Sequence, residues 1–178
     1  MATYVALLYS IVLTPQRRVV MSDLRAMATE LGFERPRTLA STGNLIFETD
    51  STPVQQLENR LEAAFAAHFG KPVDILVREA TAWRKTVAGN PFPAESAQDG
   101  SLVVLRIMRR PLDPALTQKL EPYRSPPESL AIVAGDLWVS FAGRPSESRL
   151  LGALTTRRLG IGTFRNWNTV RGLADLLD

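Results

Sequence analysis

The chain has 178 residues and an ordinary globular composition, with 45% apolar and 22% charged residues. It contains no cysteine, which excludes disulfides, thiol catalysis and cysteine-ligated metals, and its single histidine, His68, argues against a histidine-built metal site or a Ser-His-Asp triad. No run approaches the roughly 18 apolar residues of a membrane span, and the N-terminus lacks the basic flank of a signal peptide. We therefore expect a soluble cytoplasmic protein with no membrane partner.

The net charge is only +3, although the isoelectric point is about 9.7. Arginine outnumbers lysine eighteen to three. Arginine forks suit phosphates and carboxylates, yet a bias towards arginine, alanine and leucine also arises from a GC-rich genome. Since no lysine-rich run or basic tail is present, the charge is only a weak indication of a nucleic-acid partner.

The first half of the chain predicts the element order β-α-β-β-α-β. The expected strands are Tyr4–Tyr9, Arg37–Ala40, Asn44–Glu48 and Val73–Val77, and the expected helices run from a Ser22 N-cap to Gly32 and from Thr52 to Gly70. The segment Thr52-Pro53-Val54-Gln55 has the pattern of a capping box with proline at the first helical position. His68 lies on the apolar stripe of the second helix, where a structural role is expected.

The second half predicts the same order after a short helix at Ala82–Val87 and a rigid loop at Gly89–Pro93. Its expected strands are Leu102–Met108, Ser129–Val133, Leu137–Phe141 and Thr163–Arg165, with a helix capped by Asp113-Pro114, another from Ser146 to Gly160, and a last helix containing Val170 and Leu173. Gly135-Asp136 is a two-residue hairpin turn signal. Two ferredoxin-like halves, residues 1–78 and 79–178, are therefore expected to form one compact pseudo-duplicated α+β unit.

The first strand of each half, Tyr4–Tyr9 and Leu102–Met108, lacks the alternation of apolar and polar residues. Such strands are usually covered on both faces. We expect helices to cover one face, and the other half or a partner chain to cover much of the second.

The densest group of polar side chains is the segment Thr163–Thr169, between an apolar strand and an apolar helix. A helix N-terminus presents free amides and a positive dipole end, and Arg165 adds a fork that binds anions in a bidentate manner. The ligand-binding residues expected from this arrangement are Arg165, Asn166, Asn168, Thr163 and Thr169, and the natural ligand is a phosphate or a carboxylate. In the alternative interpretation Asn166 or Asn168 caps the helix, Trp167 packs, and the segment serves only the fold.

The long loop from Ser10 to Val20 contains two further cations, Arg17 and Arg18, which either lie in solvent or add charge to a nearby anion site. No P-loop, G-x-G-x-x-G, G-x-S-x-G or H-E-x-x-H motif is present. The acidic residues are expected at helix caps, on helix faces and in turns. No two carboxylates are therefore expected to lie close together. We find no catalytic constellation and no cofactor motif, and a binding protein is therefore expected rather than an enzyme.

The chain resembles the bacterial family known as domain of unknown function 1697 over nearly its whole length. The segments that carry this resemblance are Tyr4-Val-Ala-Leu-Leu8, Met21-Ser-Asp-Leu-Arg25, Leu31-Gly-Phe33, Thr42-Gly-Asn-Leu-Ile-Phe47, Asn90-Pro-Phe-Pro93, Ser148-Arg-Leu150, Leu159-Gly160 and, most specifically, Arg165-Asn-Trp-Asn-Thr169. The resemblance implies an α+β fold of ferredoxin-like halves. It implies no reaction, because the biochemical function of the family is not established.

The loop after the first strand departs from the family pattern. Members of the family usually have Arg-Gly-Ile-Asn-Val-Gly-Gly there, whereas the stretch Tyr9–Pro15 keeps only the isoleucine. Glycine-rich loops let backbone amides approach a ligand closely, and this loop cannot do so in the same way. An altered ligand preference or a lost activity would follow.

Four functions are compatible with these observations. The leading hypothesis is a non-catalytic binding domain for a small anionic ligand, such as a nucleotide. The alternative is a nucleic-acid-binding protein, in which Tyr4, Tyr9 and Phe47 would stack on bases. An enzyme that uses Arg, Asn and Thr groups for oxyanion stabilisation, and a purely structural or interaction protein, rank below these. The sequence does not define the oligomeric state.

Overall fold

The computed structural model describes residues 1–178 and is 39% helical and 28% strand with antiparallel sheets, which confirms the α+β class. The chain divides into two compact units, residues 1–85 with 172–178, and residues 86–171. The boundary expected after residue 78 lies within a strand of the first unit, and the C-terminal segment belongs to that unit. None of the helices combines the length and hydrophobicity needed to cross a membrane.

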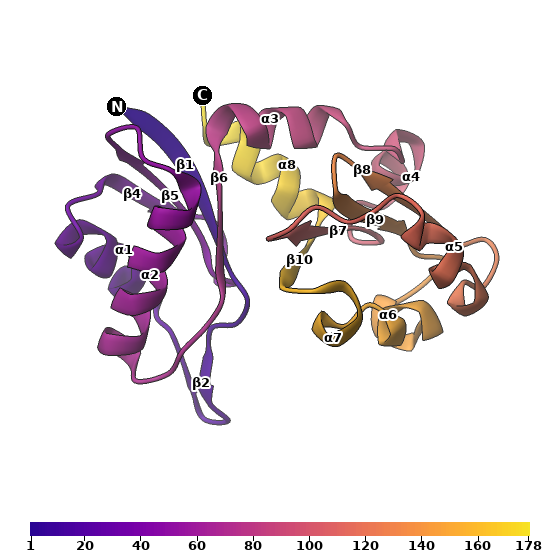
Figure 1. Ribbon diagram of the computed structural model, residues 1–178, viewed down its shortest axis with the longest axis horizontal. Coiled ribbons are helices and arrows are strands. Elements are labelled where there is room, and N and C mark those ends of the chain that lie inside the picture. Colours follow the sequence, from indigo (N-terminus) through magenta and orange to yellow (C-terminus); the bar gives the residue numbers. More distant parts are fainter. The chain divides into compact units, whose positions relative to one another are not determined.

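Unit 1 contains an antiparallel sheet with the strand order β4-β5-β1-β6 and two helices packed on one face of it (Figure 1). The strands are β1 (Ala2–Leu8), β4 (Glu34–Thr38), β5 (Asn44–Thr49) and β6 (Ile75–Glu79), the helices are α1 (Met21–Glu30) and α2 (Val54–Phe69), and a small hairpin is formed by β2 (Val12–Thr14) and β3 (Arg17–Arg18). The expected hairpin of β4 and β5 is confirmed by its pairing of Arg37 with Ile46.

The central strand β1 is buried on both faces, as its unbroken apolar sequence predicts. Tyr4, Ala6 and Leu8 contribute to the core under α1 and α2, and the intervening Val5 and Leu7 are fully buried as well. The hydroxyl of Tyr4 also donates to the Thr52 carbonyl and accepts from the Thr52 amide, both at 3.0 Å. The strand is therefore held by packing along its length and by a polar anchor near its start.

Two expected helix caps of unit 1 are wrong. Ser22 lies inside α1, because the helix begins one residue earlier, at Met21, with Val20 as the N-cap. Thr52 does not form a capping box, because its hydroxyl donates to the Asp50 carbonyl at 2.7 Å and Pro53 is the N-cap residue of α2. The C-terminal end of α2 is as expected: Gly70 adopts a left-handed conformation with φ of 73°.

Two carboxylates of α2 bind the amides of the edge strand β6. Glu58 Oε2 accepts from the Val77 amide at 3.1 Å, and Glu62 Oε2 accepts from the Ile75 amide at 3.1 Å. Residues four apart on a helix share one face, so both side chains reach the same strand. An edge strand otherwise leaves a row of amides unpaired, and these two contacts satisfy part of that row.

Unit 2 contains a four-stranded antiparallel sheet with the strand order β10-β7-β9-β8. Its elements are α4 (Pro93–Gln98), β7 (Val103–Met108), α5 (Leu116–Leu120), the 3-10 turns η1 (Glu121–Tyr123) and η2 (Pro145–Glu147), β8 (Ser129–Val133), β9 (Asp136–Ser140), α6 (Arg149–Ala153), α7 (Thr156–Leu159) and β10 (Gly162–Asn166). Two helices, α3 (Ala80–Ala88) and α8 (Trp167–Asp175), contain the points at which the chain passes between units. In both units the first sheet strand lies between the third and the fourth.

The long helix expected from Ser146 to Gly160 is instead two short ones. Ser148 caps α6 by accepting from the Leu150 amide at 3.1 Å, and its hydroxyl donates to the buried Glu128 at 2.5 Å. Thr155 then caps α7 by accepting from the Arg158 amide at 3.3 Å. Because both caps need an extended backbone, the apolar spacing continues through the segment while the helix does not. The short helix α4 was not expected at all.

The turn between β8 and β9 is centred on Ala134-Gly135, one residue earlier than expected. Both residues have positive φ, 50° and 87°, and Asp136 pairs with Val133 as the first residue of β9. Asp136 is buried, and its Oδ1 accepts from the Met108 amide at 2.9 Å. The aspartate therefore joins two strands instead of forming the turn.

We expect Gly135→Ala to lower the free energy of unfolding by about 2–4 kcal/mol. The alanine would have to adopt a left-handed backbone, and its Cβ would lie 2.6 Å from Pro111 Cβ and 2.7 Å from Pro111 Cα. Gly143→Ala is the matched control, since nothing lies within 4 Å of a Cβ there. Urea unfolding followed by circular dichroism measures both variants, and equal stability of the two would contradict this account of the turn.

We expect Glu58→Ala to lower the free energy of unfolding by about 2 kcal/mol, because the Val77 amide would lose its carboxylate partner in a buried position. Asn59→Ala, on the exposed side of the same helix, should change it by less than about 0.5 kcal/mol. Hydrogen exchange of the Val77 amide gives an independent readout. Unchanged protection in Glu58→Ala would show that the contact does not stabilise β6.

Candidate functional site

The polar segment Thr163–Thr169 forms the junction of β10 and α8, with no loop between the two elements. Strand β10 pairs with the buried strand β7 from Gly162 opposite Met108 to Asn166 opposite Val104. The helix begins at the next residue, Trp167. The side chains of the segment are therefore placed by the sheet on one side and by the first helical turn on the other.

Arg165 is directed to protein groups and not to solvent. Only 8% of the residue is exposed, and its Nη1 donates to Thr163 Oγ1 at 2.9 Å and to the Phe164 carbonyl at 2.7 Å. Burial lowers the pKa of the guanidinium to about 10, so it stays charged at neutral pH. Thr163 is buried with it. These two expected ligand-binding residues thus bind each other in the core of unit 2.

Asn166 caps α8. Its Oδ1 accepts from the Thr169 amide at 3.1 Å, which satisfies one of the amides that a helix N-terminus leaves without a partner. This confirms the capping interpretation for Asn166. The Trp167 amide is also occupied, because it donates to the Gly100 carbonyl at 3.1 Å. Two amides of the first turn, those of Trp167 and Thr169, therefore already have protein partners.

Asn168 differs from Asn166, because its side chain is exposed and lines a cavity of about 510 Å³. The cavity lies within unit 2 and is formed by the end of α3, by α4 and by the start of α8. Its lining comprises Val87, Ala88, Asn90, Pro93, Ser96, Ala97, Gly100, Trp167, Asn168 and Arg171. Arg171 is the single charged side chain of this lining, so the cavity is positively charged. Arg171 is the functional candidate that sequence reasoning missed.

Gly100 allows α8 to approach the segment after α4. A Cβ at this position would collide with Asn168 Oδ1 and would lie 3.1 Å from Trp167 Cδ1. A larger residue at this position would therefore require the side chains of Asn168 and Trp167 to move. The sequence contained an Asp99-Gly100 pair, which is a turn signal, but no pattern that related it to residues more than sixty positions away.

The expected rigid loop around Asn90 forms one wall of the cavity. Asn90 Oδ1 accepts from the Phe92 amide and its Nδ2 donates to Ser96 Oγ, both at 2.8 Å. Trp167 also lines the cavity, and its ring lies 6.1 Å from that of the buried Trp138 at an angle of 49°. Hydrogen bonds of Asn90 and aromatic packing of Trp167 therefore both hold residues of the lining in place.

The remaining two expected site residues, Arg17 and Arg18, belong to unit 1. Both are exposed on the short strand β3, next to β2. Thr169 is half-buried at the start of α8, and only its amide has a contact with another site residue. Of the expected set, the structure joins Arg165 with Thr163 and Asn166 with Thr169, while Asn168 alone lines the cavity.

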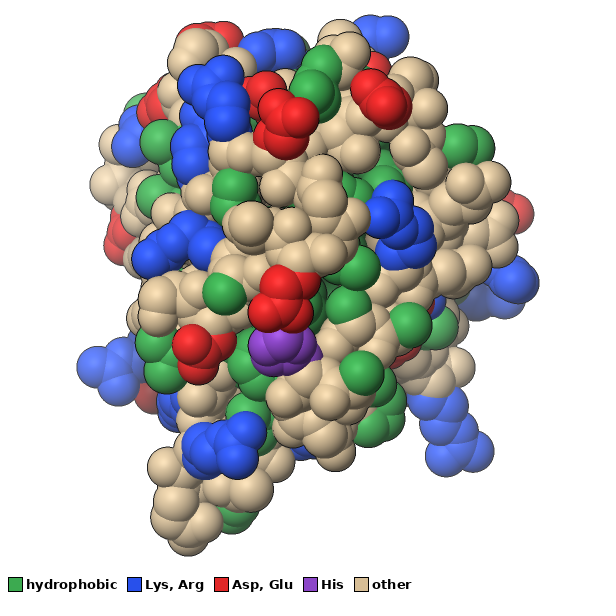
Figure 2. All heavy atoms as spheres, turned by 90° about the vertical axis from the view of Figure 1, so that its left-hand side faces the viewer, with side chains coloured by type: hydrophobic (Ala, Val, Ile, Leu, Met, Phe, Trp, Pro, Cys, Tyr) green, Lys and Arg blue, Asp and Glu red, His purple; other side chains and the backbone are tan.

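The aromatic residues expected to stack on bases are mostly inaccessible. Tyr4 and Phe47 are buried and stack on each other at 5.7 Å, and Tyr9 is exposed. Figure 2 shows basic and acidic side chains interspersed over one face, with His68 among them, and His68 Nδ1 lies 3.6 Å from Glu30 Oε2. No group of three or more His, Asp or Glu side chains is placed to hold a metal ion.

Comparisons with known proteins agree with this architecture. A solved structure, that of the conserved bacterial protein SP0830 from Streptococcus pneumoniae, is similar with a TM-score of 0.77 at 22% sequence identity, over 99% of each chain. A likeness at this identity shows the fold. A search of the curated proteins finds no match.

A family model matches residues 1–138 of the chain, and its description is a protein of unknown function, DUF1697. The match ends within β9, before the β10–α8 junction. Since the matched region covers more than half of the sequence, the chain belongs to the DUF1697 family of proteins of unknown function.

Proposed function

We propose that the protein is a non-catalytic binding protein for a small anionic ligand that bears a phosphate or carboxylate group, such as a nucleotide. The cavity beside α8 is the site. The single observation that supports this most strongly is that Trp167, Asn168 and Arg171 line one cavity without any acidic side chain. The sequence predicts Arg165 as the cation of the anion site. In the proposed site Arg171 takes this role, because Arg165 is buried.

Two side chains would recognise the anionic group. Arg171 is exposed and can present two parallel N–H groups to a phosphate or carboxylate. Asn168, one helical turn earlier, adds an amide donor. The N-terminal dipole end of α8 favours a negative charge at the same place. Side chains carry the recognition, because the amides of Trp167 and Thr169 already have protein partners.

The indole of Trp167 favours a ligand with a flat, aromatic part. The side chain is half-buried, lines the cavity and packs against Trp138 on its inner side. An indole face that remains accessible is a stacking surface for a nucleobase. A nucleotide combines such a base with a phosphate and therefore matches both the indole of Trp167 and the guanidinium of Arg171.

The lining also supports binding without catalysis. It contains no carboxylate and no histidine, and its one hydroxyl, that of Ser96, belongs to a buried residue and accepts from Asn90 at 2.8 Å. General acid–base and nucleophilic mechanisms need a group that can exchange a proton with the substrate. Such a group would have to come from the ligand or from outside this lining.

For the fold, we infer two ferredoxin-like halves that arose by duplication. We also infer that the protein works in the cytoplasm. The inference of duplication is supported by the equal strand orders of the two sheets, β4-β5-β1-β6 and β10-β7-β9-β8, and by the first strand of each unit being buried throughout its core segment.

We expect a thermal-shift screen of inorganic phosphate, pyrophosphate, citrate and adenine and guanine nucleotides to raise the Tm of the wild-type protein with at least one compound. Arg171→Gln should abolish the shift, because it removes the one charge of the cavity. Arg157→Gln is the matched control, since Arg157 is exposed on α7 and outside the cavity. No shift across the panel, or equal shifts in both variants, would refute the proposed site.

The two asparagines of α8 should separate fold from function. Asn166→Ala removes the helix cap and should cost about 1 kcal/mol of stability, with ligand affinity unchanged. Asn168→Ala should leave the Tm of the free protein nearly unchanged and lower the affinity for the ligand found in the screen by about tenfold. Calorimetric titration of both variants measures the affinity. Unchanged affinity in Asn168→Ala together with weaker binding in Asn166→Ala would indicate that Asn168 does not contact the ligand.

A further inference from the structure

Unit 2 contains a second cavity, of about 590 Å³, which we call the acidic cavity. It is formed by the end of α4, by the segments that precede β7 and β8, and by the end of β9. Its lining comprises Glu95, Gln98, Asp99, Leu102, Pro127, Ser140, Phe141 and Ala142. Two carboxylates thus line the cavity together with apolar side chains, and no basic side chain does.

Helix α4 separates the acidic cavity from the cavity beside α8. Pro93, Ser96 and Ala97 line the cavity beside α8, whereas Glu95 and Gln98 line the acidic cavity. Residues three and four apart share one face of a helix, so the two sets lie on different faces of α4. The sequence did not indicate this pair of surfaces, because no helix was expected at α4.

The two carboxylates of the acidic cavity are placed where they repel each other. Glu95 and Asp99 are four residues apart, and the Asp99 amide donates to the Glu95 carbonyl at 2.9 Å. Like charges at this spacing destabilise a helix, and a negative charge after its last residue opposes the helix dipole. Both side chains are exposed, and neither forms an ion pair within the chain. A cation bound between them would relieve both effects.

Asp99 keeps one oxygen for a ligand. Its Oδ1 accepts from the Ser101 hydroxyl at 2.6 Å and from the Ser101 amide at 3.0 Å. These two hydrogen bonds lower the pKa of Asp99 below its usual value, so the carboxylate is charged at neutral pH. Its Oδ2 forms no hydrogen bond within the chain.

Ser140 gives an independent indication of a ligand. The residue is only 8% exposed and lines the acidic cavity, but its hydroxyl has no hydrogen-bond partner in the chain. Side chains alternate along a strand, so Ser140 lies on the same face of β9 as Trp138, and Val139 belongs to the core on the other face. Buried polar groups are rarely left without a partner. The hydrogen-bonding capacity of this hydroxyl is therefore directed into the cavity.

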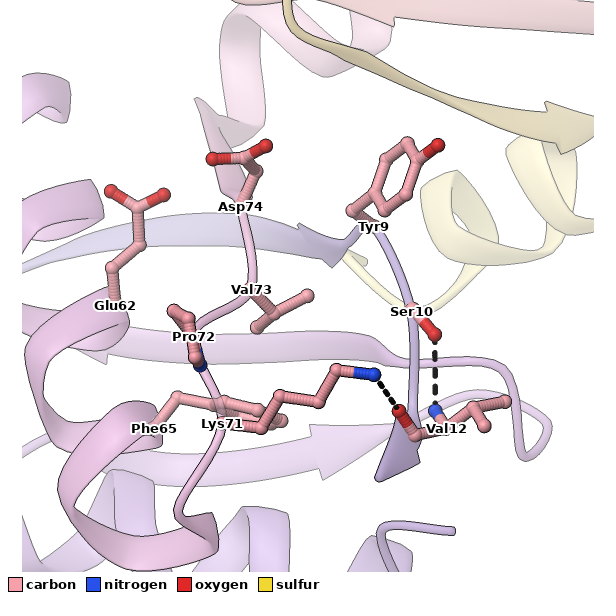
Figure 3. A pocket seen from close by; sticks show the side chains of 9 residues that line it. All are labelled: Tyr9, Ser10, Val12, Glu62, Phe65, Lys71, Pro72, Val73 and Asp74. Carbon is pink, nitrogen blue, oxygen red and sulfur yellow. Dashed lines mark hydrogen bonds between the residues drawn. The ribbon is translucent and has the colours of Figure 1, made fainter. Parts of the chain in front are cut away.

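The carboxylates of a cavity in unit 1 provide a contrast. That cavity, of about 600 Å³, is shown in Figure 3. Glu62 Oε2 accepts from the Ile75 amide at 3.1 Å, and both Glu62 and Asp74 have further interactions within the chain. Lys71 Nζ donates to the Val12 carbonyl at 2.9 Å. The charged groups of the unit 1 cavity thus serve the protein itself, whereas the acidic cavity of unit 2 has carboxylates without an ion pair.

We propose that the acidic cavity binds an alkylammonium group, carried either by a free amine or by the lysine side chain of a peptide. An ammonium has three N–H donors, and the cavity offers three acceptors for them, the carboxylates of Glu95 and Asp99 and the hydroxyl of Ser140. Leu102 and Phe141 contact the alkyl chain. The proposal does not rest on the anion site beside α8, because the ligand has the opposite charge and contacts other residues.

The test is a titration of the full chain with n-butylammonium and with the peptide Gly-Lys-Gly blocked at both ends, followed by the NMR shifts of backbone amides. Butyrate is the matched anion, and the same peptide with norleucine in place of lysine is the neutral control. We expect saturable shifts of the Asp99, Leu102 and Ala142 amides at millimolar concentration with at least one of the two ammonium compounds. Binding of the amine alone would identify a free amine as the ligand, and tighter binding of the peptide would identify a lysine side chain.

Asp99→Asn should weaken n-butylammonium by about tenfold, because it removes a charge and keeps the size of the side chain. Asp113→Asn is the matched control and should bind as the wild type does. Asp113 is exposed outside the cavity, and its Oδ1 also accepts from the amide two residues later, that of Ala115, at 2.9 Å. Circular dichroism confirms that each variant is folded.

Ser140→Ala separates binding from stability. Since the hydroxyl has no partner in the chain, the variant should keep the Tm of the free protein and should bind n-butylammonium about fivefold more weakly. Butyltrimethylammonium has no N–H group to donate. Its affinity should therefore be lower than that of n-butylammonium in the wild type and unchanged in Ser140→Ala.

Three results would overturn the proposal. The first is the absence of shifts in the wild type with both n-butylammonium and the lysine peptide. The second is binding of butyrate or of the norleucine peptide as strong as that of the ammonium compounds, which would reduce the cavity to an apolar surface. The third is unchanged ammonium affinity in a folded Asp99→Asn. None of these outcomes bears on the nucleotide screen, so each of the two sites is tested separately.

Discussion

The contact between Gly100 and the start of α8 determines the cavity of unit 2. The Gly100 carbonyl accepts the Trp167 amide, and the missing side chain at Gly100 leaves the space that Asn168 occupies. This single contact brings the segment after α4 against the helix, so that Asn90 and Arg171 line the same cavity. A side chain at Gly100 would therefore displace the side chain of Asn168 from this place. The positions of the proposed ligand-binding residues therefore depend on Gly100, which has no side chain to contact a ligand.

A cluster of polar residues in a sequence does not show whether their side chains bind a ligand or form hydrogen bonds that stabilise the fold. In the segment Thr163–Thr169, Arg165 and Thr163 bind each other, and Asn166 caps the helix. Each satisfies a requirement of burial or of a helix end, and a buried polar group without a partner is costly. Asn168 has the same chemistry as Asn166 but is exposed to the cavity. Only the direction of the side chain separates the two, and that direction depends on the helical register beginning at Trp167.

Local patterns predicted much of the fold, and long-range contacts explain what they missed. The element order of both units, the hairpin of β4 and β5 and the end of α2 at Gly70 follow from apolar spacing and glycine positions. The failures depend on distant partners. The hydroxyl of Tyr4 accepts a hydrogen bond from the Thr52 amide, and Glu128 accepts one from the hydroxyl of Ser148, which caps α6. For the site, no local pattern indicated that Gly100 and Arg171 line one cavity, because that arrangement arises from the approach of segments far apart in the chain.

The two units show how one strand arrangement supports different chemistry. A backbone hydrogen bond of 2.9 Å follows the last paired residues in each, from Tyr9 to Asp74 and from Arg109 to Ile161, and a cavity lies beside both. Backbone pairing is indifferent to the side chains that it carries, so these positions could diverge without a cost to the sheet. Carboxylates and a tyrosine lie at one end, and two arginines at the other, on the same backbone arrangement. Residues at the rim of a cavity that the backbone maintains are the positions at which ligand preference can change while the core stays the same.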